Sequence, residues 1–584
     1  MLRRRLTLAV IPLALSALVL SGCTVSTASG ATSTSTVTAV ADSDLSAEAV
    51  IAENADVTVV NDDEWSEADA VDIALSGSSA TSSSDDVTVD GSTVTISAAG
   101  VYRLSGSLAG SVVVAAPDDA QVVLILDGAT IESSDAPAIT VSTADDVVIA
   151  LEGENVVSDT SSYADDADAN AAIYADTDLT ITGDGALEVH GNGNDGIAST
   201  DDLVILSGEI SVEAVDDGLR GKDSLVVEGG TITVDAGGDA LKSDQEDDAT
   251  SGFVWISGGT LQLTSVDDGI AAQTDAVITG GSLTITAGTD ATSTDDSPKG
   301  ISAGVVVSID GGEIAIDAAD DAVHSDGSVG IGGGTVTISA ADDGVHAEQT
   351  LEIRAGEVTV TDAAEGLEGV DVAISGGTVD VTASDDGINA AGNSDTSGEA
   401  DTGETLVISG GTVTVVGRGD ALDSNGSITV SGGDVAVFGP TGGGEGAVDA
   451  NGTITLDGGT LLVGGSVLKT PEGSQTWVSA SVSGSSGATV EVTDASGTVV
   501  ASFTAAADFA AVFVSDAALV AGDEYTVTVD GGSGTTATAG SGEFGQGGGQ
   551  GGGGQGGGNG GGQGGGQGGG NGGGNGGSGG PQRP

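Results

Sequence analysis

The feature that most constrains this chain is a repeat with a period close to 22 residues. Each repeat holds two short runs in which apolar and polar side chains alternate, a Gly-Gly pair between them, and an acidic turn. Alternation of this kind marks strands with one buried face, and Gly, Asp and Asn at their ends are turn formers. The run before the acidic turn is found at Ile210/Val212, Ile232/Val234, Leu261/Leu263, Leu283/Ile285, Ile314/Ile316, Val336/Ile338, Val358/Val360, Val379/Val381, Val413/Val415, Val435/Val437 and Leu461/Val463.

The run after the acidic turn repeats with the same period. Strands this short cannot each bury an apolar face alone, so the repeats must stack. We therefore predict an all-β fold, a parallel β-helix of about 22 residues per coil, right-handed by the general preference for right-handed crossovers. An antiparallel sandwich would not keep so strict a long-range register. The predicted inward positions are Leu203/Ile205, Leu225/Val227, Val277, Val305/Val307, Leu351/Ile353, Val372/Ile374, Leu406/Ile408, Ile428/Val430 and Ile454/Leu456.

Two details of composition fit a solenoid. Aromatic residues make up only 2% of the chain, and ladders of Val, Ile, Leu and Ala can fill a narrow interior without them. The recurring Gly-Gly supplies corners with positive φ at no steric cost. Residues 85–466 are predicted to form the β-helix, with looser first coils before about residue 190. Residues 467–534 lose the period and predict a small β-module of longer antiparallel strands, such as 488–494 and 524–529, that covers the end of the solenoid.

The chain ends predict export and flexible segments. Residues 1–22 combine three arginines, an apolar stretch too short to span a membrane comfortably, and the sequence LSGC, which looks like a bacterial lipobox. Cys23 is the only cysteine, so we expect lipid attachment there and a protein held on the extracellular face of the cell membrane. Residues 23–84 are predicted to be a Ser/Thr/Ala-rich tether and lead-in, and residues 535–584 a disordered Gly/Gln/Asn-rich tail.

The net charge of −77 excludes nucleic acid as a partner, because nucleic acid is bound by Lys and Arg. Acidic residues of the turn instead fall on one register, predicted to form a column along the solenoid: Asp195, Asp217, Asp239, Asp268, Asp321, Asp343, Glu365, Asp386 and Asp420. The residue before is often acidic too, at Asp216, Asp267, Asp320, Asp342 and Asp385. One coil has lost the acid and carries Lys299 in its turn.

Carboxylates stacked about 5 Å apart repel one another by roughly 1–3 kcal/mol per neighbour, so they must be neutralised. Protonation is one answer and Ca²⁺, which takes six to eight oxygen ligands, is the other. The predicted ligands are Asp195, Asp216, Asp217, Asp239, Asp267, Asp268, Asp320, Asp321, Asp342, Asp343, Asp385 and Asp386. A simpler interpretation is that Asp only favours turns. With three histidines and one cysteine in the chain, Zn²⁺ is disfavoured.

Basic residues follow the acids by three positions, at Arg220, Lys242, His324 and His346. They either compensate the local charge or form a cationic strip that binds a polyanion lying along the axis. Arg220, Lys222 and Lys242 are the predicted ligand-binding residues, because the column is best preserved beside them. For the two histidines, charge compensation is the favoured interpretation.

Three sequence segments carry a resemblance to a known family: NAAIYADTDLTITGDGALEVHGNGNDGIAST, DDGLRGKDSLVVEGGTITVDAGGDALKSD, and the earlier AAGVYRLSGSL with VVLILDGATI. Over roughly residues 87–465, with LVAGDEYTVTV in the terminal module, the chain resembles bacterial extracellular carbohydrate-binding β-helix proteins, first described from a cellulolytic clostridium. The resemblance implies a pectate-lyase-like β-helix, Ca²⁺ on stacked aspartates, and affinity for acidic glycans such as polygalacturonate. Later coils depart from the motif at Ala364-Glu365, Gly419-Asp420 and Glu445-Gly446.

Three functions follow. The favoured one is a lipid-anchored, Ca²⁺-dependent polysaccharide-binding protein, monomeric and not an enzyme. The second is a Ca²⁺-dependent polysaccharide lyase with Lys222 or Lys242 as the base, although a Lys among acids has a raised pKa that does not suit this role. The third is a surface stalk or adhesin without a small ligand.

Overall fold

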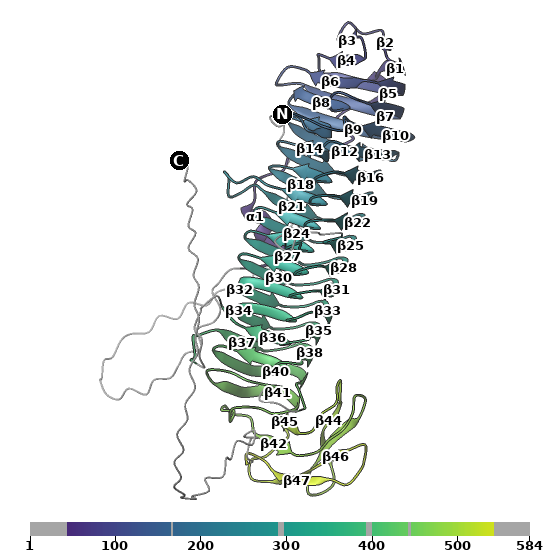
Figure 1. The fold of residues 1–584 in the computed structure, drawn as a ribbon. Coiled ribbons are helices and arrows are strands. Elements are labelled where there is room, and N and C mark those ends of the chain that lie inside the picture. The colour runs from purple at the N-terminus through teal and green to yellow at the C-terminus, as the bar shows by residue number, and fades with distance from the viewer. Residues whose placement is uncertain (1–43, 165–166, 290–296, 393–399, 442–445, 542–584) are drawn as a thin grey trace, which may run out of the picture. The chain divides into compact units, whose positions relative to one another are not determined.

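The computed structural model describes residues 44–164, 167–289, 297–392, 400–441 and 446–541. Within this part of the chain the fold is a solenoid of parallel strands stacked coil upon coil, as predicted (Figure 1). Each central coil contributes three strands to three parallel ladders. The right-handed sense of the β-helix stays a prediction. No helix among the described residues is long and apolar enough to cross a membrane.

The first ladder follows the acidic turns. It contains β8 (Ile139–Thr143), β11 (Ala171–Ala175), β14 (Asp195–Ser199), β17 (Leu219–Gly221), β20 (Leu241–Ser243), β23 (Ile270–Ala272), β26 (Ile301–Ala303), β29 (Val323–Ser325), β32 (Val345–Ile353), β34 (Leu367–Ile374), β36 (Ile388–Ala390) and β39 (Leu422–Ser424). Each strand pairs in parallel with the next, for example Arg220 opposite Lys242 and His324 opposite His346.

The second ladder contains β9 (Asp146–Glu152), β12 (Asp178–Gly183), β15 (Asp202–Ile205), β18 (Ser224–Val227), β21 (Phe253–Ile256), β24 (Asp275–Ile278), β27 (Val306–Ile309), β30 (Ser328–Ile331), the second halves of β32 and β34, β37 (Thr405–Ile408), and parts of β40 (Ser427–Phe438) and β41 (Ile454–Gly464). The third contains β10 (Glu154–Ser158), β13 (Ala186–Gly191), β16 (Glu209–Ala214), β19 (Thr231–Ala236), β22 (Thr260–Ser265), β25 (Ser282–Ala287), β28 (Glu313–Ala318), β31 (Thr335–Ala340), β33 (Glu357–Asp362), β35 (Thr378–Thr382) and β38 (Thr412–Val416), and continues into β40 and β41.

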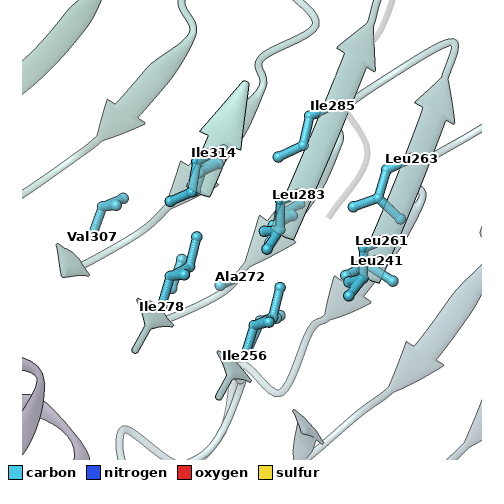
Figure 2. Packing of buried hydrophobic residues seen from close by; sticks show 14 of the residues in the cluster. Leu241, Ile256, Leu261, Leu263, Ala272, Ile278, Leu283, Ile285, Val307 and Ile314 are labelled. Carbon is cyan, nitrogen blue, oxygen red and sulfur yellow. The ribbon is translucent and has the colours of Figure 1, made fainter. Parts of the chain in front are cut away.

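The predicted inward residues of the third ladder are confirmed. Ile210 pairs with Ile232, which pairs with Leu261, and the register continues through the chain to Leu461. Figure 2 shows the interior where Leu261, Leu263, Leu283, Ile285 and their neighbours converge. At the corner before this ladder the second glycine of each Gly-Gly has positive φ, for example 93° at Gly230 and 91° at Gly259.

For two residues of the second ladder, the predicted inward direction of the side chain is wrong. Ala276 and Ile278 face the core, whereas Val277 packs outside the coil, and Val305 is 50% exposed. The strand around Val277 is apolar on both faces, because a second layer covers its outer face. Without polar residues on one side, alternation no longer tells which residues point inward.

That second layer is the segment 45–70, which we call the strap. It contains α1 (Ala47–Glu53) and η1 (Glu67–Asp69), and it crosses the outer face of the second ladder against the order of the repeats. Its hydrogen-bond partners run from Asp310 through Asp275 and Asp202 to Thr180. The strap was expected to belong to a tether, but its valines are buried against the solenoid.

The parallel pairing begins before residue 85. After the strap come β1 (Val71–Gly77), β2 (Ala80–Ser82), β3 (Val87–Asp90), β4 (Thr93–Ile96), β5 (Gly100–Ala109), β6 (Ser111–Ala115) and β7 (Gln121–Glu132). The first of these, β1, already pairs in parallel with β5, which pairs with β7. The hairpins β1–β2 and β3–β4 are antiparallel.

The last described segment has the antiparallel strands that the loss of period predicts. It holds β42 (Trp477–Ala480), β43 (Thr489–Thr493), β44 (Val499–Thr504), β45 (Val512–Ser515), β46 (Glu524–Val529) and β47 (Thr535–Thr538). Strand β45 pairs antiparallel with β41, the last strand of the solenoid, and so occupies its edge. Cys23, residues 1–22 and residues 542–584 lie outside the described residues, so the signal peptide, the lipid attachment and most of the tail stay predictions. The disordered tail was predicted to begin at residue 535, but residues 535–538 form β47, which pairs antiparallel with β46.

Candidate functional site

The predicted acidic column is present. From Asp195 to Asp420, the turns before the strands of the first ladder place the column residues of successive coils beside one another, and all but one of these residues are acidic. Backbone contacts fix this register: Gly218 N–H donates to the Asp239 carbonyl, Gly300 N–H to that of Asp321, and Gly387 N–H to that of Asp420. Lys299 occupies the column position in the coil that lacks an acid, since Gly269 donates to its carbonyl.

The column has a structural role that the sequence did not reveal. The Oδ1 atom of most column aspartates accepts the backbone N–H of the residue at the column position one coil further on. Asp239 N–H donates to Asp217 at 3.0 Å, Asp268 N–H to Asp239 at 2.9 Å, and Asp343 N–H to Asp321 at 3.1 Å. A buried backbone donor without an acceptor costs free energy. Hydrogen bonding to the turn therefore explains the fixed register in part, and leaves Oδ2 for a cation.

The side chain that meets Oδ2 differs from coil to coil. The Lys242 ammonium lies 3.0 Å from Asp217 and 2.8 Å from Asp239, both almost fully buried. Lys299 pairs with Asp320 at 2.9 Å. The outward positions of the first ladder run, in chain order, Ala198, Arg220, Lys242, Ala271, Ser302, His324, His346, Glu368, Asn389 and Asp423, so bases give way to acids.

The three predicted ligand-binding bases lie on neighbouring coils but are not equally available. Arg220 is bound to Asp244, with Nη2 2.8 Å from Oδ2, and Lys242 is held between its two aspartates. For the Lys222 ammonium, no hydrogen bond or salt bridge is found within the described ranges. Burial opposes the charge on Lys242, but Asp239 and Asp217 outweigh it and raise its pKa.

Several column acids carry raised pKa values. Burial, reinforced by neighbouring carboxylates, raises the pKa of Asp195, Asp268 and Asp420 to about 7. Asp343 and Asp386 behave in the same way, and the pKa of Asp239 rises to about 6 despite Lys242. Within the described residues Asp195, Asp268, Asp386 and Asp420 make no salt bridge, which makes them the places where a cation would be stabilised most.

Several of the predicted metal ligands converge. Carboxylate oxygens lie within 4.8 Å of one another in the groups Asp195/Asp216/Asp217, Asp239/Asp267/Asp268 and Asp320/Asp321/Asp342. Asp343 gathers with Glu365 and Glu368 instead. Asp385 precedes Asp386 in the chain and is exposed. All donors are oxygens, the ligand type that Ca²⁺ takes in flexible geometry, so the residues present fit that ion.

Glu368 and Asn389 were missed as site residues. Burial and the neighbouring Glu365 raise the pKa of Glu368 to about 9. The Asn389 amide donates to Glu365 at 2.8 Å, while its Oδ1 is buried without a hydrogen-bond partner. Both stand in the outward row that begins with Arg220, so the spacing of three after each acid could have found them.

Over 137 residues the chain is 35% identical to a carbohydrate-binding domain-containing protein of Acetivibrio thermocellus, a match that spans 22% of this chain and 48% of that relative. The chain thus spans about half the length of the curated relative it matches. A solved structure described as the polysaccharide lyase-like protein from C. thermocellum, a gadolinium derivative, is 25% identical, with a TM-score of 0.36 over 50% of this chain and 97% of that one.

A family model for carbohydrate-binding domain-containing proteins matches residues 90–344 and 339–542, which together make up more than half of the chain. The two matched stretches contain the acidic column and the antiparallel strands that follow the solenoid. This chain therefore belongs to the carbohydrate-binding domain-containing protein family.

Proposed function

We propose that this chain binds acidic polysaccharide, such as polygalacturonate, through Ca²⁺ ions on the acidic column, and that it is not an enzyme. Membership of a carbohydrate-binding family supports the glycan as ligand. The observation that carries the proposal is the run of closely spaced carboxylates along the column, of which Asp195 and Asp268 have raised pKa values and make no salt bridge within the described residues. A bound Ca²⁺ would offer its remaining coordination positions to the carboxylates of a uronate chain.

The group Asp239/Asp267/Asp268 is the best candidate for the first ion, with Asp267 and Asp268 as its main ligands because Lys242 already lies 2.8 Å from Asp239. It lies one coil from Arg220 and Lys222, and the next outward position after Lys242 is the small Ala271, which leaves the column uncovered there. Lys222 is the base we expect to contact the glycan directly, because Arg220 and Lys242 are held by aspartates. Asp244, which holds Arg220, has a buried Oδ1 without a partner.

Calorimetry with oligogalacturonate tests this proposal, in Ca²⁺ and in EDTA. We expect binding in Ca²⁺, its loss in EDTA, and at least a tenfold weakening in the double variant Asp267→Asn, Asp268→Asn. Asp235→Asn, on the exposed side of β19, is the matched control and should bind normally. Equal binding in Ca²⁺ and EDTA would rule out calcium as the bridge.

A lyase reaction is the alternative. Its base would have to be unprotonated, and the raised pKa of Lys242 argues against that residue. Lys222, whose ammonium makes no salt bridge within the described residues, is the remaining candidate, so incubation with polygalacturonate should be followed for ultraviolet-absorbing unsaturated product. Product that disappears in Lys222→Ala would replace the binding proposal with an enzymatic one.

Anchoring at Cys23 belongs to the proposal as well. A lipidated Cys23 would hold a monomeric glycan-binding solenoid on the extracellular face of the cell membrane. Cys23→Ala should release the protein into the medium, as fractionation of expressing cells would measure. Unchanged membrane association would exclude this anchor.

A further inference from the structure

The fold brings together two of the chain's three histidines. His324 on β29 and His346 on β32 are direct cross-strand partners on adjacent coils of the first ladder. Their ring centroids are 5.1 Å apart and the rings are nearly perpendicular, at 88°. Both follow a column aspartate by three residues, and so both rings lie beside the acidic column.

Both rings direct the same nitrogen toward one carboxylate oxygen. The Nδ1 atom of His324 lies 3.0 Å from Asp321 Oδ2, and the Nδ1 atom of His346 lies 3.7 Å from the same oxygen. Asp321 is 5% exposed, and the two imidazoles are partly accessible, at 13% and 24% of their side-chain surface. One ligand atom from each of the three residues lies within 4.8 Å of the other two.

The spacing of these atoms fits a tetrahedral metal. Zn²⁺ lies about 2.0–2.2 Å from His nitrogen and carboxylate oxygen, which places tetrahedral ligand atoms roughly 3.3–3.5 Å from one another. The observed separations of 3.0 and 3.7 Å from Asp321 Oδ2 lie on either side of that range. Asp343 Oδ2 lies 3.5 Å from His346 Nδ1 and so borders the site.

Further hydrogen bonds hold the proposed ligands in place. The Asp321 carboxylate is fixed by the Asp343 N–H, which donates to its Oδ1 at 3.1 Å. On the far side of the His324 ring, Nε2 is 3.3 Å from Asp326 Oδ1. A carboxylate that accepts the other ring N–H is the arrangement that orients metal-binding histidines and raises their basicity.

We propose that Asp321, His324 and His346 form a binding site for a divalent transition-metal cation such as Zn²⁺. Imidazole nitrogens select such cations over Ca²⁺, which prefers oxygen, so this site is chemically distinct from the rest of the column. It goes beyond the proposed glycan function and does not depend on it. In the sequence, the small number of histidines argues against a zinc site. The stacking of the coils, however, brings two of the three histidines next to each other.

The competing explanation is that the histidines are only counter-ions. Lys242 is a counter-ion at the equivalent position of another coil. Its ammonium bridges Asp217 and Asp239 in the same way as His346 bridges Asp321 and Asp343. This likeness supplies a sharp control. His346→Lys keeps a cation in that place and removes the ligand nitrogen.

The test uses the metal-stripped, full-length protein, titrated with Zn²⁺ by calorimetry in excess Ca²⁺, and with Co²⁺ by visible absorption. We expect one Zn²⁺ per chain at this site, a raised Tm, and a tetrahedral Co²⁺ spectrum. His346→Lys and His324→Gln should each weaken binding at least tenfold, and Asp326→Asn should weaken it about tenfold by loosening the His324 ring. His190→Gln, at the third histidine, should bind like the parent.

Equal Zn²⁺ affinity in His346→Lys and the parent would overturn the proposal, as would a loss confined to His190→Gln or no binding at all. Circular dichroism of each variant keeps a folding defect separate from a lost ligand. Because the glycan assay contains no Zn²⁺, its outcome is independent of this one.

Discussion

At the scale of single residues, the column aspartates do two things at once. In Asp217, Asp239 and Asp321, for example, one oxygen accepts the N–H of the next turn while the other pairs with a base that differs from coil to coil. Asp321 shows the balance most clearly. Although burial alone would raise its pKa, the hydrogen bonds with His324 and His346 outweigh that effect and hold the pKa of Asp321 below its usual range.

Lys242 should be the most important counter-ion for stability. Replacing it with Met in Lys242→Met leaves Asp217 and Asp239 buried without a cation, which should cost about 3–5 kcal/mol of unfolding free energy. Ca²⁺ should recover part of that loss by taking the place of the ammonium. Denaturant unfolding with and without Ca²⁺ measures both effects.

Lys222→Met is the matched control, since the described residues offer its ammonium no salt bridge. It should change stability by less than about 0.5 kcal/mol. If Lys242→Met were as stable as this control, the lysine would not be what neutralises the column.

At the scale of elements, the first ladder is a row of coils whose outward residues change from basic to acidic. The sequence predicted the alignment of the acids and of the bases after them, because a fixed period becomes a fixed position in space. It did not predict that Lys242 would form salt bridges with two aspartates while Lys222 would form none within the described residues. That distinction depends on side-chain directions across coils, which no spacing encodes.

The raised pKa values of the column predict how stability depends on pH. Asp195, Asp268 and Asp420 have pKa values near 7 in the folded chain against an ordinary value of 3.8. A group whose pKa rises on folding binds its proton more tightly in the folded state, so its stabilising effect is lost as pH rises from about 4 through 7. In EDTA the protein should be less stable at pH 8 than at pH 5.

The difference should reach about 2 kcal/mol or more, since one pKa unit corresponds to about 1.4 kcal/mol. Thermal unfolding across this pH range, in EDTA and then in Ca²⁺, measures it. Ca²⁺ should flatten the dependence by replacing the protons. A stability that rises from pH 5 to pH 8 in EDTA would contradict the pKa values and the cation sites inferred from them.

At the scale of the whole described chain, segments outside the repeat cover the solenoid in two places. Strand β45 occupies the edge of β41, and the strap covers the apolar outer face of the second ladder. Val57 is buried there against Val226 and Trp255, among others. These contacts join residues nearly two hundred positions apart, and they turn an expected linker into part of the core.

The strap should therefore contribute to stability. Val57→Asp places a charge against the apolar face and should cost about 2–3 kcal/mol, with a red shift of Trp fluorescence as Trp255 becomes exposed. Denaturant unfolding followed by fluorescence measures both. Glu53→Ala, at an exposed position of α1, should behave like the parent. A Val57→Asp protein with unchanged stability and emission would show that the strap is dispensable.

The sequence by itself determined the period, the parallel stacking, the inward residues of the third ladder and the position of the acidic column. It could do so because a solenoid is almost one-dimensional, so neighbours in space are one repeat apart in sequence. Only the tertiary structure decided which face the strap covers, which base each aspartate holds, and that His324 and His346 converge on Asp321. These outcomes depend on side-chain direction and on contacts between segments outside the repeat, and neither follows from a period.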